Sequence, residues 1–148
     1  MSTNHFYICT AIPYVNDKPH IGHAMDFIYA DVLARYQRQL GADVAFSIGT
    51  DEHGTKIAEK AAAAKMTPKE FTDSIVPKWQ EFATLAGLSN DRFVRTTSPE
   101  HEKRAVLIWK NLDKYIYKGS YIGLYCVGCE TYYTEAVVKA NNGICPDH

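Results

Sequence analysis

The first fifty residues alternate between short apolar runs and one long amphipathic segment. The apolar run at 6–10 predicts a short buried strand, and residues 24–40 carry apolar side chains at helical spacing, which predicts a long helix with one buried face. A second apolar run at 43–48 predicts another strand, and Gly41 is a fitting end for the helix before it. Two strands around a long helix predict a right-handed βαβ unit, and therefore an α/β fold with a parallel sheet.

The later segments continue this pattern and then change character. We expect helices at 52–65, 67–85 and 98–118 and a short strand at 92–95. In the last of these helices, the apolar stripe from Ala105 to Ile116 predicts a buried face. From Tyr121 onward the sequence is rich in Tyr, Gly and Cys, which indicates a small inserted module. We therefore predict two parts: residues 1–117 as the first half of a Rossmann-like, doubly wound parallel-sheet nucleotide-binding domain, and residues 118–148 as the start of an insertion.

Composition and charge limit the possible functions. The formal net charge of −1 gives no overall electrostatic attraction to nucleic acid, so we expect any surface for nucleic acid to be local or to lie outside this sequence. No segment has the length and apolarity of a membrane span, and the N-terminus lacks the pattern of a signal peptide. We expect a cytoplasmic protein with no membrane partner.

The segment between the first strand and the first helix has the features of an anion-binding helix start. Unpaired N–H groups and the helix dipole make such a junction attractive to phosphate. We expect Asp17 to be the N-cap, with Pro19 in the first helical turn.

Two histidines follow this predicted cap. His20 and His23 are three residues apart, so we expect them to share one helical face, or alternatively to cap the turn and pack within the helix. Gly22 between them has no side chain, which lets a flat group such as a nucleobase or ribose approach the backbone. Lys18 adds a positive charge nearby. This combination predicts a site for a nucleotide.

The segment 49–54 follows the second predicted strand. Because ligands of open parallel sheets bind at the carboxyl ends of the strands, the fold brings 11–23 and 49–54 to one edge. Asp51 is then placed to pair with a cationic group of a ligand at this edge, or alternatively to cap the helix at 52–65. The roles of Glu52 and His53 stay open.

Two pairs of metal-ligand residues lie near the C-terminus. Cys126 and Cys129 are separated by two residues, as are Cys145 and His148. Thiolates and imidazole at this spacing favour a tetrahedral Zn²⁺ with all positions filled, and hence a structural metal. The alternative is a set of buried cysteines without metal, and fraying of the terminus would leave three ligands.

Residues 20–23 read His-Ile-Gly-His, which resembles the HIGH signature of class I aminoacyl-tRNA synthetases. With Ala-Ile-Pro-Tyr-Val-Asn at 11–16 and Gly-Thr-Asp-Glu-His-Gly at 49–54, the chain is similar to the methionyl-tRNA synthetase family, and its cysteine spacing resembles the zinc knuckle of that family. The resemblance implies activation of L-methionine with ATP and Mg²⁺ to methionyl-adenylate, and transfer of the methionyl group to tRNA(Met).

The resemblance also implies roles for individual residues. His20 and His23 would be catalytic donors to the ATP phosphates, with Gly22 and Lys18 completing the ATP site. Methionine would be bound by four residues: Ala11, Ile12, Tyr14 and Asp51. Ile12 is equally compatible with an ordinary core position.

The family is several times longer than this chain, so we expect an N-terminal fragment that is inactive alone and lacks the KMSKS-type loop and the anticodon-binding domain. Two other hypotheses remain open at this point. One is a different synthetase or nucleotidyltransferase with the HIGH element, and the other is a non-catalytic, zinc-stabilised fragment.

Overall fold

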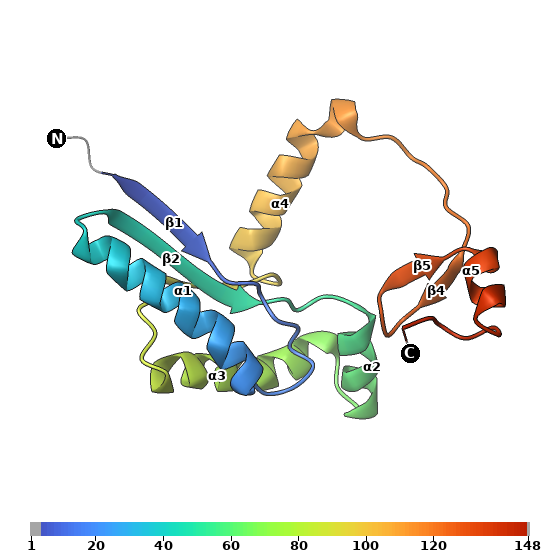
Figure 1. The fold of residues 1–148 in the computed structure, drawn as a ribbon, viewed down its shortest axis with the longest axis horizontal. Helices are drawn as coiled ribbons and strands as arrows, with labels where there is room; N and C mark the ends of the chain where they lie inside the picture. Colours follow the sequence, from blue (N-terminus) through green and yellow to red (C-terminus); the bar gives the residue numbers. More distant parts are fainter. Residues whose placement is uncertain (1–3, 148) are drawn as a thin grey trace. The chain divides into compact units, whose positions relative to one another are not determined.

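The computed structural model describes residues 4–147, which divide into two compact units, one through Leu107 and the other from Ile108. The first unit contains, in order, β1 (His5–Cys9), α1 (Ile21–Gln39), β2 (Asp43–Thr50), α2 (Thr55–Ala63), α3 (Pro68–Leu85) and β3 (Arg92–Arg95) (Figure 1). It therefore has the alternating α/β organisation that the apolar pattern predicts.

The three strands form one parallel sheet in the order β1-β2-β3. Strand β2 is central, with His5 opposite Asp43 on one side and Ser47 opposite Arg92 on the other. The predicted strand at 43–48 is two residues longer than expected, because Gly49 and Thr50 also pair with β3. A Cβ on Gly49 would lie 2.2 Å from the Val94 carbonyl oxygen, so only glycine fits this close approach.

One apolar core joins α1, α2 and α3 to the sheet. Its largest fully buried side chains come from different elements: Phe27 of α1, Phe46 and Ile48 of β2, Ile57 of α2 and Trp79 of α3. Burial against this shared core stabilises α1, α2 and α3, since tertiary packing supplies most of helical stability in proteins. It also fixes the loops that follow β1 and β2.

The local signals for α3 are confirmed. Thr67 is its N-cap and Glu70 completes a capping box, with Pro68 at the first helical position. Helix α2 begins later than predicted, at Thr55, because Gly54 has φ +117° and no helical conformation is possible there.

Two predictions of burial are wrong. Alternate residues of β1 are exposed, Tyr7 by 67%, because β1 lies at the edge of the sheet within residues 4–147. The stripe from Ala105 to Ile116 is also exposed, including Trp109 at 64%. This stripe spans α4 (Pro99–Asn111) and the 3-10 turn at Asp113–Tyr115, and the described elements do not cover it.

The second unit holds a small antiparallel hairpin and a short helix. The hairpin consists of β4 (Leu124–Cys126) and β5 (Thr131–Tyr133), and α5 (Glu135–Ala140) follows it. Among residues 4–147, no helix has the length and apolar character needed to cross a membrane.

Candidate active site and metal centre

The loops after β1 and β2 meet directly, as the fold rule predicts. Tyr14 and Asp51 form an isolated parallel bridge. The Val15 N–H donates to the Asp51 carbonyl oxygen at 3.2 Å, and the Asp51 N–H donates to the Pro13 carbonyl oxygen at 2.9 Å. Two segments that are far apart in the sequence are thus joined at the carboxyl edge of the sheet, where open parallel sheets bind ligands.

The start of α1 is capped by the two histidines. His20 is the N-cap, and its Nδ1 accepts a hydrogen bond from the Gly22 N–H at 3.1 Å. In return, the His20 N–H donates to Nδ1 of His23 at 3.2 Å. The rings lie 3.8 Å apart between centroids, so the pair forms one reciprocal cap.

The prediction that Asp17 caps this helix is wrong. The helix begins at Ile21, four residues further on, so the carboxylate of Asp17 accepts instead from the Lys18 N–H at 2.7 Å. Pro19 precedes the N-cap and is not in the first helical turn. The alternative that His20 caps the turn is confirmed instead, although Ser, Thr, Asp and Asn are the usual N-caps.

The capping geometry fixes the tautomer of both imidazoles. Each Nδ1 accepts from a backbone N–H, so in the neutral ring the proton sits on Nε2, which becomes the donor. Burial lowers the pKa of His23, and the neighbouring His20 lowers it further against an opposing effect of Asp26. The lowered pKa favours the neutral form of His23, and the ring geometry leaves Nε2 of both histidines as the atom that can donate a hydrogen bond to an anion.

Gly22 and Trp79 support this arrangement in ways that sequence periodicity does not reveal. A Cβ on Gly22 would lie 3.0 to 3.1 Å from atoms of the His20 ring, so the glycine makes room for the capping imidazole. Trp79 is buried, and its indole N–H donates to the Asp17 carbonyl oxygen at 3.1 Å. Its ring also meets the ring of His23 edge-on at 4.7 Å.

Asp51 is half-buried, and its Oδ1 lies 3.4 Å from both the His53 nitrogen and the Thr96 hydroxyl. The alternative that Asp51 caps the following helix is wrong, because α2 begins after Gly54 and has no side-chain cap. These weak contacts leave most of the acceptor capacity of the carboxylate for another group.

The remaining predicted ligands lie along the loop after β1. Ala11, Ile12 and Lys18 are exposed, with Ile12 at 39%, so Ile12 does not belong to the core that the described residues form. Tyr14 is half-buried, and the Lys56 ammonium lies 5.7 Å from the centroid of its ring. Tyr14 is thus anchored at the bridge to Asp51, at the junction of the two loops.

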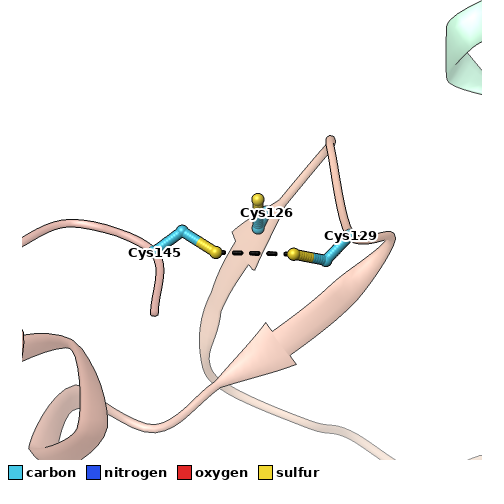
Figure 2. A group of neighbouring side chains, drawn as sticks. All are labelled: Cys126, Cys129 and Cys145. Carbon is cyan, nitrogen blue, oxygen red and sulfur yellow. Dashed lines mark hydrogen bonds between the residues drawn. The ribbon is translucent and has the colours of Figure 1, made fainter. Parts of the chain in front are cut away.

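Three of the four predicted metal ligands cluster in the second unit (Figure 2). Cys126 ends β4, Cys129 lies in the hairpin turn, and Cys145 follows α5; their sulfur atoms all lie within 4.8 Å of one another. The sulfurs of Cys129 and Cys145 are 3.4 Å apart. Such a group of thiols fits Zn²⁺. His148 lies outside the described residues.

Asp147 also approaches this cluster. Its carboxylate accepts a hydrogen bond from the Tyr133 hydroxyl and lies 3.7 Å from the Cys129 sulfur. The segment next to His148 is therefore held against the hairpin.

The chain is similar to methionine–tRNA ligases over most of its length. The methionine–tRNA ligase of Brucella melitensis is 44% identical over 137 residues, covering 91% of this chain and 27% of that protein. That of Thermotoga maritima is 42% identical over 148 residues, covering 96% of this chain and 23% of that protein. The chain thus spans about a quarter of the length of these curated relatives.

A solved structure described as Mycobacterium tuberculosis methionyl-tRNA synthetase in complex with methionyl-adenylate is similar to this chain, with a TM-score of 0.84 and 35% identity. The match covers 91% of this chain and 27% of that one. A family model described as tRNA synthetases class I (M) matches residues 6–148. Because this match covers nearly the whole chain, the chain belongs to the methionine (M) family of class I tRNA synthetases.

Proposed function

We propose that this chain is the N-terminal part of a methionine–tRNA ligase, and that the whole enzyme is about as long as the methionine–tRNA ligases that the chain matches. Such an enzyme joins methionine to the α-phosphate of ATP, releases pyrophosphate, and passes the methionyl group to tRNA(Met). The observation that carries the proposal is the backbone bridge between Tyr14 and Asp51, which brings the histidine-capped helix start and a carboxylate to one sheet edge. The relatives and the methionyl-adenylate complex support the same reaction.

The histidine pair holds the phosphates of ATP. Phosphoryl transfer of this kind depends on positioning and on stabilising the negative charge that spreads over the phosphate oxygens. His20 and His23 supply Nε2–H donors at the N-terminus of α1, where the helix dipole also favours an anion. Lys18 adds a cation on the same loop, and Gly22 leaves room for the capping ring of His20. ATP is bound as its Mg²⁺ complex.

Asp51 pairs with the ammonium group of methionine. An ammonium that leaves water needs a compensating charge, and the carboxylate of Asp51 has few partners among the described residues. Ala11, Ile12 and Tyr14 contact the apolar side chain of the amino acid from the neighbouring loop. The two substrates then meet between the two loops, with the carboxylate of methionine directed at the α-phosphate.

The second unit is a structural zinc module. Cys126, Cys129 and Cys145, with His148, would hold Zn²⁺, and these ligands would then cross-link the β4–β5 hairpin to the segment after α5. Residues 118–148 accordingly form the start of the insertion, and residues 1–117 belong to the catalytic domain. The enzyme works in the cytoplasm, where its tRNA substrate is found.

The test is amino-acid-dependent ATP–pyrophosphate exchange by a full-length protein that carries this chain. We expect exchange with L-methionine and none of comparable rate with leucine, isoleucine, valine or cysteine. Homocysteine, which lacks one methyl group, should be the strongest competitor, since one methylene separates substrates by only about 1–3 kcal/mol. Preference for another amino acid, or exchange independent of amino acids, would contradict the proposal.

A further inference from the structure

Glu52, beside the proposed ammonium-binding residue, is one of the few buried charged residues among those described. Its exposed fraction is 3%. The carboxylate accepts hydrogen bonds from Nε and Nη2 of Arg95 at 2.6 and 2.7 Å, from the Thr50 hydroxyl at 2.8 Å and from the Thr97 hydroxyl at 2.5 Å. Glu52 therefore faces the protein interior and is unavailable to a substrate.

Arg95 extends this network to another element. It ends β3, and its Nη2 also donates to Asp73 of α3 at 2.6 Å. Burial alone would raise the pKa of Glu52, but hydrogen bonds from Arg95, Thr97 and Thr50 and the charge of Arg95 outweigh it and lower the pKa. Hydrogen bonding to Glu52 likewise raises the pKa of Arg95 above its ordinary value. Glu52 and Arg95 are therefore a buried, fully charged pair.

Backbone contacts fix Asp51 on both sides. On one side it is bridged to Tyr14. On the other, the Glu52 N–H donates to the Thr96 hydroxyl at 2.9 Å, and the Thr96 N–H donates to the Thr50 carbonyl oxygen at 3.3 Å. Successive side chains of extended backbone point to opposite sides, so drawing Glu52 inward directs Asp51 outward.

We infer that Glu52 and Arg95 are positioning residues that orient the Asp51 carboxylate toward the ammonium group of the amino-acid substrate, an inference that rests on the proposed function of Asp51. They touch no substrate themselves. Their ion pair fixes the backbone conformation of residues 50–52. The Thr96 hydroxyl couples this conformation to the Asp51 side chain, because it contacts both the Glu52 N–H and the Asp51 carboxylate.

The experiment compares two competitive inhibitors of methionine-dependent exchange in the full-length enzyme. L-Methioninol keeps the ammonium group and lacks the carboxylate, whereas 4-(methylthio)butanoate keeps the carboxylate and lacks the ammonium group. Glu52→Gln and Arg95→Lys should weaken inhibition by L-methioninol about tenfold, since one charge-assisted contact is misaligned. Inhibition by 4-(methylthio)butanoate should stay within about twofold of the wild type.

Asp31→Asn is the matched control. Asp31 is also buried and paired with an arginine, Arg35 at 2.6 Å, and with Ser89, but it lies in α1 away from Asp51. Asp31→Asn should lower thermal stability and change the inhibition by L-methioninol and by 4-(methylthio)butanoate to the same extent. If Glu52→Gln weakens both inhibitors equally, as a general loss of structure would, the positioning role is wrong.

Two further variants keep the outcome clear. Should Glu52→Gln fail to fold, Asp73→Asn weakens the outer contact to Arg95, together with the ion pair between Asp73 and Lys69, and should give the same selectivity at smaller size. Equal effects on both inhibitors would again overturn the inference. Asp51→Asn tests the proposed function separately. If Asp51→Asn leaves inhibition by L-methioninol unchanged, the proposed role of Asp51 is wrong. If Asp51→Asn weakens inhibition by L-methioninol alone, and Glu52→Gln and Arg95→Lys do not, only the positioning role is wrong.

Discussion

His23 has two separable roles, and one pair of substitutions distinguishes them. Its Nδ1 accepts from the His20 N–H, which stabilises the start of α1, and its Nε2–H is the proposed donor to ATP phosphate. His23→Ala removes both. His23→Gln keeps the helix cap, because glutamine at this third helical position completes a capping box. The glutamine amide does not lie where Nε2–H of the imidazole lies, so the donor to phosphate is lost.

The expected magnitudes follow from these contacts. Loss of the cap costs about 1 kcal/mol of stability. Loss of a donor that acts in the transition state costs about 2.7–4 kcal/mol, or about 100- to 1000-fold in rate. We therefore expect His23→Ala to lower both stability and the rate, and His23→Gln to recover most of the stability and little of the rate. The affinity for methionine should change by less than about threefold in both, since Asp51 binds the amino acid.

The measurements are single-turnover formation of the adenylate, calorimetric binding of methionine, and denaturant unfolding of the full-length enzyme. His5→Ala is the control, because His5 is an exposed histidine at the start of β1, paired only with Asp43 among its described contacts. If His23→Gln recovered the rate together with the stability, the helix cap and not the phosphate donor would explain the importance of His23.

Three more measurements test the contact of Trp79, the pKa of His23 and the cysteine cluster. Trp79→Phe removes the hydrogen bond to the Asp17 carbonyl oxygen, so adenylate formation should slow about tenfold with little change in the KM for methionine; an equal rise in KM would contradict this. Because the pKa of His23 is lowered on folding, its contribution to stability is lost as the pH falls below about 6.5, and unfolding curves of His23→Gln between pH 7 and 5 should show a smaller loss. Cys145→Ser should sharply reduce bound zinc by metal analysis, and Cys9→Ser, outside the cluster, should not.

The sequence predicts the parts of this site that depend on local patterns. Apolar periodicity locates the strands and helices, and the rule for parallel sheets brings residue 14 to residue 51. Propensities rank aspartate above histidine as an N-cap and so favour Asp17 over the alternative, His20. The reciprocal contact of His20 and His23 depends instead on the geometry of their rings. Local rules carry no information of that kind.

Other features depend on distant partners. The inward direction of Glu52 follows from Arg95, 43 residues later, and the contact of Trp79 with residue 17 spans 62 residues. No periodicity predicts such pairs. The exposed stripe of α4 is the opposite case, since a helical apolar pattern predicts a buried face, and none of the described elements covers it.

The most direct test is a crystal structure of the full-length enzyme with a non-hydrolysable methionyl-adenylate analogue in which a sulfamoyl group replaces the phosphate. We predict that the ammonium group of the analogue lies about 3 Å from the Asp51 carboxylate and that the sulfamoyl group lies at the start of α1, beside His20 and His23. An ammonium group bound by other residues, with Asp51 directed away from it, would contradict the account.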